Sequence, residues 1–405
     1  MLRNKVLYIS YDGLLEPLGR SQVLAYARKL AKDFQITLLT FEKTRDLDDV
    51  DRVEMTRLEV EKFHIQWIPL RYHKRPTLLA TGFDIAHGLL RALWLSRGHD
   101  FKIVHARSYV AAMIGLFVKS ILRKRFVFDM RGFWVDEGIT KGMWRENSVL
   151  YRLGRFFERQ YLCRADAVVS LTNAAVSEMR QWTYLRSKKI DFRVIPTCCD
   201  LERFTIDGKK ASRDDSFVLG CVGNVSIWYR FDSVLQCFKI LRQSHPNAKL
   251  LVLNRDQQEF ILKSVDAAEV PRSAVELVAV HHENVASQIR RMNAAVFFIR
   301  PSFAELARAP TKLGELLGCG VPCLTTRGIG DMDLQIGDGK VGVLVDFNDL
   351  DRPEILGGAI LQLIEMAADP ETKVRCNEAA QRYFSLDGGA SRYRELYFDL
   401  LSEVR

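Results

Sequence analysis

Residues 301–345 read PSFAELARAPTKLGELLGCGVPCLTTRGIGDMDLQIGDGKVGVLV, and this stretch decides the fold. Pro310 suits the first position of a helix, where its missing N–H leaves no bond unmade. The amides of Thr311 and Lys312 then point out of the helix end, and the positive end of the helix dipole favours an anion there. The glycines of the GCG triplet end the helix, and VPCLTT reads as a buried strand. The stretch therefore predicts an α/β domain with an anion site at a helix start.

Glu315 lies three residues after Lys312, so the two side chains rise from one face of the predicted helix. Lys312 adds a full charge to the helix end, and a phosphorylated ligand rich in hydroxyls fits between it and the carboxylate. The alternative is an ordinary amphipathic helix in which Lys312 and Glu315 form a solvated pair.

Short apolar runs alternate with helical patterns along the whole chain. The first half contains VLYISY, QITLLTF, FHIQWIPL, IVHARSY, RFVFDMR and AVVSLT. The pattern restarts after Pro196 with SFVLGCVGN, AKLLVLNR, VELVAV, AAVFFIRP, VPCLTT and VGVLVDF. Such alternation predicts parallel, doubly wound sheets with helices on both faces. Two Rossmann-like domains are expected, with ligands beyond the carboxyl ends of the strands in a cleft between them.

Composition places the chain among soluble globular proteins. It has 405 residues, 48% hydrophobic and 27% charged, which is too long for one ordinary core. No run of 18 apolar residues suggests a membrane span, and MLRNKVLYISYDG shows no cleavage site for a secretory signal. Its eight cysteines form no CxxC pair and no Cys/His spacing suited to zinc. We expect a protein of the reducing cytoplasm.

The positive charge lies in the first half of the chain. Lys and Arg exceed Asp and Glu by 12 in residues 1–200, whereas residues 201–405 carry a net −3, which gives the total of +9. Such a face suits an anionic membrane surface or a polyphosphate-linked acceptor. Nucleic acid is the competing interpretation, and it ranks lower because no nucleic-acid motif accompanies the charge. The third interpretation is a basic surface without a specific partner.

The residues around Glu315 resemble a known family. Glu315 with Gly320 and Pro322 resembles the second half of the donor-site signature of retaining, nucleotide-sugar-dependent glycosyltransferases of the GT-B fold and the glycosyltransferase family 4 type. That signature has two glutamates separated by seven residues, the second followed by a small-Gly-x-Pro turn. The resemblance covers nearly the whole chain. It includes YISYDGLLEPLGRSQVLAYARKLAK, VIPTCCDLERF, DMRGFWVDE, GNVSIWY and RPSFAELARAPTKLGELLGCGVP, of which the last three are similar to a branch associated with bacterial surface polysaccharide assembly.

The chain departs from the family pattern at several positions. Asn224 and Tyr229 stand where many relatives have an Arg and a Lys that clamp the donor diphosphate. Ala307 stands at the first glutamate of the pair, and Glu305 is the nearest substitute. Arg131 stands where many relatives have a histidine. By resemblance, Arg230, Arg308 and Lys312 would then serve the diphosphate and Arg131 the reaction centre, unless activity has been lost.

The resemblance implies three parts of the chain. Residues 1–197 would form an acceptor-side Rossmann-like domain, residues 198–386 a donor domain, and residues 387–405 a helix that crosses back to the first domain. The implied activity is retaining, metal-independent transfer of a sugar from a nucleotide diphosphate to a hydroxyl of a lipid-linked or polysaccharide acceptor. No cofactor is expected. The protein would be cytoplasmic and peripheral on the cytoplasmic face of the membrane.

The resemblance and the helix–strand pattern together predict the site residues. The expected catalytic residues are Arg131, His105, Lys312 and Glu315. The expected donor-binding residues are Gly223, Asn224, Trp228, Tyr229, Arg230, Glu305, Arg308, Pro310, Thr311, Lys312, Leu313 and Glu315. The expected acceptor-side residues are Gly19, Ser21, Gln22 and Arg107.

Each of these residues has a plainer interpretation. Arg131 could form a structural ion pair with Asp129 or Asp136, and His105 could be a satisfied core histidine. The pair Trp228–Tyr229 could anchor the core instead of stacking on a base or sugar, and Gly19 could serve only a tight turn. Two other functions use the same fold. A nucleotide-sugar epimerase would convert the donor alone, and a silent partner would bind sugar nucleotide or lipid without transfer.

Overall fold

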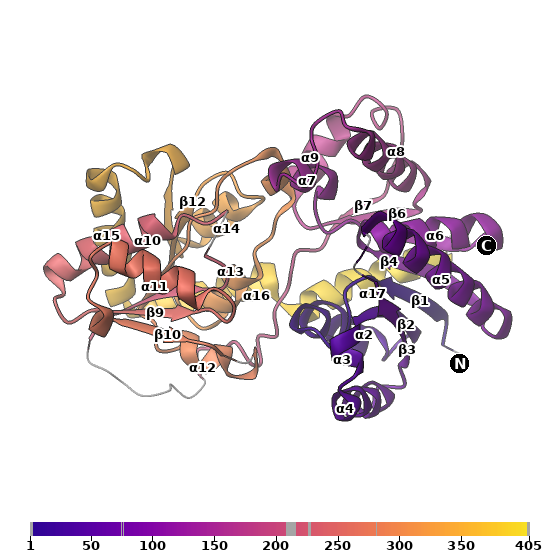
Figure 1. Ribbon diagram of the computed structural model, residues 1–405, viewed down its shortest axis with the longest axis horizontal. Helices are drawn as coiled ribbons and strands as arrows, with labels where there is room; N and C mark the ends of the chain where they lie inside the picture. Colours follow the sequence, from indigo (N-terminus) through magenta and orange to yellow (C-terminus); the bar gives the residue numbers. More distant parts are fainter. Residues whose placement is uncertain are drawn as a thin grey trace. The chain divides into compact units, whose positions relative to one another are not determined.

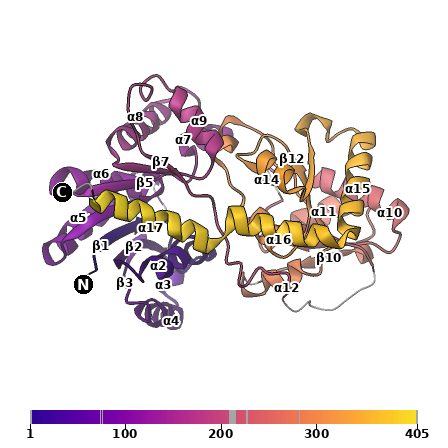
Figure 2. The same ribbon diagram turned by 180° about the vertical axis from the view of Figure 1, so that it is seen from behind.

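The computed structural model describes residues 3–73, 75, 77–207, 216–225, 228–280 and 282–402. The chain divides into two compact units, shown in Figures 1 and 2. The first unit holds Met1–Pro196 and Leu386–Arg405, and the second holds Thr197–Ser385. Within the GNVSIWY motif, Ser226 and Ile227 lie outside the described residues.

The first unit is built on a seven-stranded parallel sheet of order β3-β2-β1-β4-β5-β6-β7. Its strands are β1 (Lys5–Ser10), β2 (Gln35–Lys43), β3 (Gln66–Tyr72), β4 (Phe101–Arg107), β5 (Arg125–Asp129), β6 (Ala167–Ser170) and β7 (Phe192–Val194). The order reverses between β1 and β4, which makes the carboxyl edge at that point the expected place for a ligand.

Helices cover both faces of this sheet. Its helical segments are α1 (Pro17–Gly19), a π turn (Arg20–Leu24), α2 (Ala25–Leu30), α3 (Thr44–Leu47), α4 (Val50–Glu61), α5 (Thr77–Gly98), α6 (Ser108–Leu122), α7 (Trp134–Thr140), α8 (Val149–Arg164), α9 (Asn173–Gln181) and α17 (Leu386–Ser402). Helix α17 packs beside α2, as Figure 2 shows, and α5 packs beside α6. The right-handed crossover rule puts these two pairs on opposite faces.

The second unit is built on a six-stranded parallel sheet of order β10-β9-β8-β11-β12-β13. Its strands are β8 (Val218–Val222), β9 (Lys249–Leu253), β10 (Val275–Val278), β11 (Ala294–Val296), β12 (Cys323–Thr326) and β13 (Gly342–Val345). Its α-helices are α10 (Phe231–Ser244), α11 (Gln258–Ala267), α12 (Val285–Ile289), α13 (Thr311–Gly318), α14 (Met332–Gly339), α15 (Pro353–Ala368) and α16 (Pro370–Phe384), and its short 3₁₀ turns are Arg272–Ala274, His282–Asn284, Phe303–Ala307 and Phe347–Asp349. Two doubly wound parallel sheets are thus present, as predicted.

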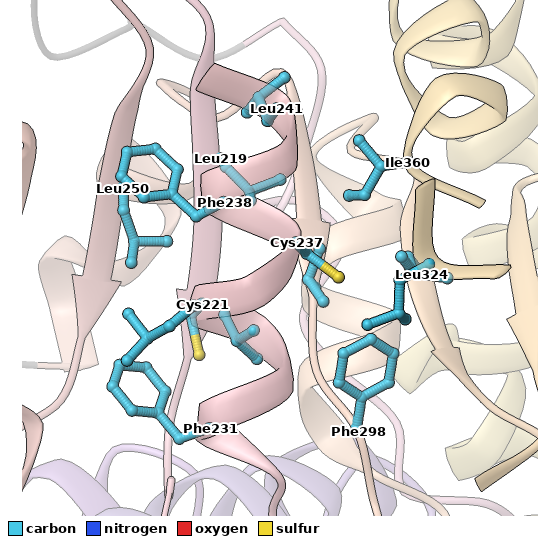
Figure 3. Close-up of a cluster of buried hydrophobic side chains, with 14 of the residues drawn as sticks. Leu219, Cys221, Phe231, Cys237, Phe238, Leu241, Leu250, Phe298, Leu324 and Ile360 are labelled. Atoms are coloured by element: carbon cyan, nitrogen blue, oxygen red, sulfur yellow. The ribbon is translucent and has the colours of Figure 1, made fainter. Parts of the chain in front are cut away.

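Apolar side chains fill both faces of the second sheet. One core lies between the sheet and α10, α11 and α15, and Figure 3 shows Phe238 of α10 beside Leu219 and Leu250 of the strands. The other lies between the sheet and α12, α13, α14 and α16. All eight cysteines are free thiols and seven are buried, so they behave as small hydrophobes. The predicted strands are buried for the same reason, because both faces of a parallel sheet are covered.

Three boundaries differ from the predictions. Strand β7, Phe192–Val194, was not predicted, because three half-buried residues leave no apolar run to detect. The helix after β1 begins at Pro17, before the predicted SQVLAYARKLAK, and passes through a π turn. Pro310 precedes helix α13 as its N-cap, and Thr311 is the first helical residue.

Candidate functional site

A glycine loop follows β8 at the carboxyl edge of the second sheet. Gly223 has φ +86°, a left-handed conformation that favours glycine. Asn254, which follows β9, donates from Nδ2 to the Gly223 carbonyl at 2.8 Å. The Gln257 Oε1 accepts from the Val225 amide at 3.0 Å. Asn254 and Gln257 were not predicted from the sequence, although polar residues just beyond a predicted parallel strand are a usable signal.

Lys312 leaves the first turn of α13 and reaches this loop. Its Nζ lies 4.3 Å from the Tyr229 ring centroid and 5.2 Å from that of Phe297. A Cβ on Gly223 would stand 3.4 Å from Nζ, so the lysine end lies within van der Waals distance of this glycine. The ammonium nitrogen is buried, and it has no hydrogen-bond partner among the residues that the structure describes. A buried ammonium in this state favours an anionic ligand.

Glu315 stands one turn further along the buried face of α13. Burial raises the pKa of its carboxyl to about 7, although the charges of Arg203 and Lys312 act in the opposite direction. Arg203, whose charge acts on Glu315 from the turn at residues 201–204, was not predicted from the sequence. The carboxylate and two cations thus gather at one helix, which makes the Lys312–Glu315 pair partly buried instead of solvated.

Two predicted diphosphate ligands are held by carboxylates. Arg230 binds Asp232 at 2.8 Å and Asp351 at 2.5 Å. Arg308 forms an ion pair with Glu305, its neighbour in the same turn. Either guanidinium would have to leave its partner to bind phosphate. Phosphate binding by Arg230 and Arg308 therefore stays a prediction, as does the predicted donor contact of Glu305.

The remaining donor-side predictions divide into core and surface. Leu313 is fully buried in the apolar core, so its side chain is not a ligand contact, and Ala307 is buried too. Tyr229 forms an antiparallel bridge with Ile299 and supports Lys312 with its ring. The Trp228 carbonyl accepts a hydrogen bond from the Arg300 amide at 3.0 Å, and both Trp228 and Tyr229 are half-buried. Donor contacts of Asn224, Trp228, Pro310 and Thr311 stay predictions.

In the first unit, a buried polar network closes the carboxyl edge at β4 and β5. Asp129 Oδ2 lies 3.4 Å from His105 Nε2 and accepts from the Tyr393 hydroxyl at 3.0 Å. Arg131 lies 3.7 Å from Asp129 Oδ1, which is the ion pair of the plainer interpretation. Burial raises the pKa of Asp129, but Arg131 and His105 outweigh it and bring the pKa to about 2.

His105 belongs to the core of the first unit. Its ring is fully buried, and the Tyr397 hydroxyl lies 2.7 Å from Nδ1. Burial lowers the pKa of this imidazole, so it is neutral at physiological pH. With Asp129 accepting from Nε2, Nδ1 accepts from the tyrosine. The prediction of a proton shuttle is therefore corrected to a structural role that ties α17 to the sheet.

Arg131 has an unusual backbone. Its φ is +60°, in the left-handed region that a long side chain seldom occupies. Such strain persists where the surrounding structure fixes it, and functional sites are a common place for it. Asp129 supplies that fixation by holding the guanidinium. Burial alone would lower the pKa of Arg131, but the charge of Asp129 outweighs burial and raises the pKa above its usual value, so the guanidinium stays charged.

We expect Asp129→Asn to lower the free energy of unfolding by about 3 kcal/mol, because it removes the carboxylate from a buried arginine. Urea unfolding at neutral pH measures the loss. The pKa of Asp129 is lower in the folded state than in the unfolded state. In the wild type, the Asp129 carboxylate therefore stabilises the fold above its unfolded pKa, and this stabilisation disappears as pH falls towards about 2. Asp51→Asn, at an exposed position on α4, is the control. Equal stability of both variants would contradict the assigned network.

Three predicted acceptor-side residues serve packing. A Cβ on Gly19 would lie 1.9 Å from the Gly13 carbonyl oxygen, so glycine is required by the loop itself. Gln22 is buried, and Arg107 is buried and lies 3.2 Å from Asp12. Their contact with an acceptor stays a prediction. Ser21, half-buried at the start of the helix, stays a prediction.

Two further carboxylates shape this edge and were missed. Glu42 is fully buried and accepts from the amides of Leu14 and Leu15 at 2.8 and 3.0 Å, which fixes the loop after β1. Asp84 is also fully buried, and it binds the Tyr11 hydroxyl at 2.7 Å and His73 Nδ1 at 2.6 Å. These contacts join residues far apart in sequence, which no local pattern signals.

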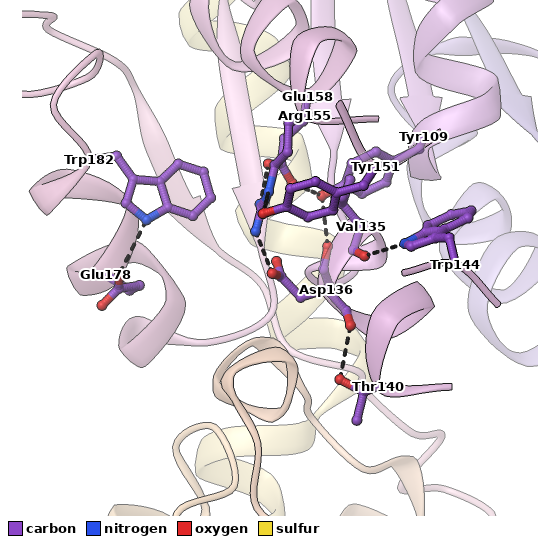
Figure 4. A network of polar contacts seen from close by, with 11 residues as sticks. Tyr109, Val135, Asp136, Thr140, Trp144, Tyr151, Arg155, Glu158, Glu178 and Trp182 are labelled. Atoms are coloured by element: carbon purple, nitrogen blue, oxygen red, sulfur yellow. Dashed lines mark hydrogen bonds and ion pairs between the residues drawn. The ribbon is translucent and has the colours of Figure 1, made fainter. Parts of the chain in front are cut away.

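The DMRGFWVDE motif continues into a second polar network, shown in Figure 4. Arg155 of α8 forms ion pairs with Asp136 of α7 and, at 2.6 Å, with Glu158. The Tyr109 hydroxyl donates to buried Glu158 at 2.6 Å. Asp136 therefore pairs with Arg155 and not with Arg131. This motif builds the junction of α7 with α8. In the described part of the chain, no cluster of three or more His, Cys, Asp or Glu side chains could hold a metal ion.

Comparison with known proteins matches both halves of the chain. Residues 19–197 match the model of the glycosyl transferase 4-like domain, and residues 202–383 match that of the glycosyl transferases group 1. The capsular polysaccharide biosynthesis glycosyltransferase CapM of Staphylococcus aureus is 22% identical over 359 residues, covering 86% of this chain and 85% of CapM.

Solved structures match over almost the full length. A glycosyltransferase from Rickettsia africae has a TM-score of 0.71 at 11% identity, covering 98% of this chain and 99% of its own. HepE of Anabaena, solved in complex with UDP and glucose, has a TM-score of 0.68 at 13% identity, covering 98% and 100%. At these identities the likeness shows the fold, which is GT-B. Together with the two matching domain models, it establishes that this chain belongs to the GT-B glycosyltransferases of the glycosyltransferase 4 type.

Proposed function

We propose that the protein is a retaining glycosyltransferase that moves a sugar from a nucleotide diphosphate to a hydroxyl of a lipid-linked or polysaccharide acceptor. The observation that carries this proposal is the buried Lys312 ammonium beside the Gly223 loop and the start of α13. CapM, by its name, serves capsular polysaccharide biosynthesis, and HepE was solved with UDP and glucose. CapM supports a role in surface polysaccharide synthesis, and HepE supports a nucleotide-sugar donor.

The proposed mechanism uses fixed charge at the donor phosphates. Lys312 and the first amides of α13 would face the diphosphate and stabilise the negative charge that grows as it departs. Glu315 would accept hydrogen bonds from the ribose hydroxyls. By family analogy, the leaving phosphate takes the acceptor proton on the same face of the sugar, so no enzyme carboxylate need act as a base. No metal is required by this arrangement.

The first unit would serve the acceptor. Arg131 is charged and held at the carboxyl edge by Asp129, which suits a phosphate-bearing acceptor or the reaction centre. The excess of 12 positive charges in residues 1–200 would attract an anionic membrane surface. The protein would then work in the cytoplasm, peripherally on the cytoplasmic face of the membrane.

A nucleotide panel tests the donor site. We expect one of UDP, GDP, ADP and CMP to raise the unfolding temperature by about 5 °C or more at 100 times its Kd, since binding there contributes about 2.7 kcal/mol. A shift that survives a chelator supports metal-independent binding. A shift that needs a divalent ion contradicts metal-independent binding. If none of the nucleotides shifts the unfolding temperature, the donor site itself is contradicted.

A catalytically silent partner is the second candidate. It is favoured by Ala307, Asn224 and Tyr229, which replace the family's sugar- and phosphate-binding residues. Such a protein would show the nucleotide shift but no transfer to any offered acceptor. Transfer in the presence of the identified donor excludes it, and product from donor alone would indicate an epimerase.

A further inference from the structure

Helix α5 turns its large apolar side chains outward. Leu79, Phe83, Leu90 and Trp94 are 74%, 57%, 67% and 56% exposed. Their spacing of four, seven and four residues places them in one line along the helix. This line, the α5 stripe, is about 22 Å long at 1.5 Å per residue.

The opposite face of α5 is the one that packs. Its buried residues are small or polar, apart from one leucine: Ala80, Asp84, Gly88, Ala92 and Leu95. A Cβ on Gly88 would stand 2.7 Å from Ile114 Cδ1 of α6 and 2.9 Å from Phe41 Cζ, so α5 packs closely against its neighbours at this glycine. Asp84 accepts from Tyr11 and pairs with His73. An ordinary surface helix has the reverse arrangement, with large apolar residues inward.

This arrangement fits an interfacial helix. Among the described residues, α5 is the one helix long and apolar enough by length and composition to span a bilayer. Yet its inner face is buried in the unit and holds the polar Asp84, which rules out lipid on all sides. Only 28% of its most apolar stretch is buried, so it is no ordinary core helix either. A helix with one apolar face outward lies in the plane of a membrane surface.

Charge around the α5 stripe selects the kind of membrane. Residues 71–125 contain eleven Lys and Arg against two Asp, a net +9. One of the two Asp, Asp84, is buried, and the other, Asp100, pairs with Lys102 and Lys124. Three of the cations are engaged elsewhere, because Arg107 is buried and pairs with Asp12, and Lys119 and Arg125 pair with Asp166. We propose that the α5 stripe inserts into an anionic lipid bilayer while the surrounding cations bind its headgroups.

Neighbouring side chains extend the same surface. Arg91 lies 4.4 Å from the Trp94 ring, a pairing that suits a headgroup region where one end is apolar and the other wet. Exposed Phe117 and Ile121 lie on α6, which Figures 1 and 2 show beside α5. A nucleic acid would match the cations but not these large apolar residues. The reason for membrane binding depends on the proposed function, because a lipid-linked acceptor lies in the membrane. The observations on α5 do not depend on it.

Vesicle co-sedimentation of the full chain tests the proposal. We expect binding to phosphatidylcholine vesicles that contain phosphatidylglycerol, and weaker binding to pure phosphatidylcholine. The double variant Leu90→Glu/Trp94→Glu should bind the anionic vesicles about tenfold or more weakly, because it places two carboxylates in the apolar layer. Leu361→Glu is the matched control, since Leu361 is 56% exposed on α15 of the second unit.

Tryptophan quenching places the contact on α5. Brominated lipids should quench part of the wild-type fluorescence, and Trp94→Phe should keep vesicle binding but lose that quenched part. Unchanged binding of the double variant overturns the proposal. So does a concentration-dependent dimer that the double variant dissolves without any vesicle binding, because the α5 stripe would then contact a second copy of the chain.

The nucleotide shift separates this proposal from the proposed function. The double variant should keep the shift that the wild type shows, which also reports that it is folded. Vesicle binding without any nucleotide shift in the wild type would retain the membrane surface and contradict the donor site. A nucleotide shift without vesicle binding would retain the donor site and contradict the membrane surface.

Discussion

Lys312→Ala is expected to lower kcat/KM for sugar transfer by about 10³-fold, because it removes the charge proposed to face the departing diphosphate. The effect should fall on nucleotide binding as well, since the ammonium has no hydrogen-bond partner within the described residues and is available to a ligand. Steady-state kinetics with the donor identified by the nucleotide panel measures the first effect, and thermal shift the second.

Removal of the Lys312 charge should not lower the stability of the unliganded protein, although it lowers activity. Lys312→Met keeps the length of the side chain and removes a buried charge, so we expect the unliganded variant to be as stable as the wild type or about 1 kcal/mol more stable. The ring contacts with Tyr229 and Phe297 limit the gain, because they favour the cation.

The control is Lys263→Met, at an exposed lysine on α11 that pairs with Glu259. It should change neither activity nor stability. Full transfer activity in Lys312→Ala would remove Lys312 from the site. A large loss of stability in Lys312→Met would instead assign the lysine to the structure of the second unit.

The fold was predictable because its signals are local. Each strand of a sheet covered on both faces is an apolar run, and each is followed by a helical pattern, so the alternation appears directly in the sequence. Strand β7 has only three half-buried residues and depends on its pairing with β6, which explains why it was missed. The π turn at Arg20–Leu24 has no sequence pattern that distinguishes it from a helix.

The candidate site was predictable only where it lies on one helix. Lys312 and Glu315 are three residues apart, and their proximity follows from helix geometry alone. Arg203 and Asn254 reach the same site from other parts of the chain, so their contribution needs the tertiary structure. The same holds for Arg230, whose partner Asp351 is 121 residues away.

The orientation of α5 shows the same limit. Its composition indicates an apolar helix, and the usual expectation is that its large residues lie inward. Only the packing of Gly88 against Ile114, and the contacts of buried Asp84, reveal which face is inward. The sequence shows how apolar a helix is, but it does not show which face of the helix packs against the rest of the protein.

Glu315→Ala should lower kcat/KM by a similar factor, about 10³-fold, and Glu315→Gln gives the sharper test. The pKa of Glu315 is raised to about 7 by burial, so near neutral pH a large part of the carboxyl is protonated. Only the carboxylate accepts two hydrogen bonds from ribose hydroxyls. Nucleotide binding should therefore weaken up to about tenfold for each pH unit below 7 in the wild type. The terminal phosphate of a nucleoside diphosphate also titrates near pH 6, and comparison with Glu315→Gln removes that contribution.

The stability of the unliganded protein should follow the opposite course. A carboxyl whose pKa is higher in the folded state stabilises the fold fully below its unfolded pKa, and this contribution is lost as pH rises through about 7. From the ordinary value of 4.5, the shift amounts to about 3 kcal/mol of stability. Glu315→Gln should remove both trends, because its amide does not titrate. Binding that improves with pH while stability declines, with both trends absent in Glu315→Gln, would assign the two effects to one carboxyl. If the wild type and Glu315→Gln show the same pH dependence of binding and stability, a group other than Glu315 is responsible.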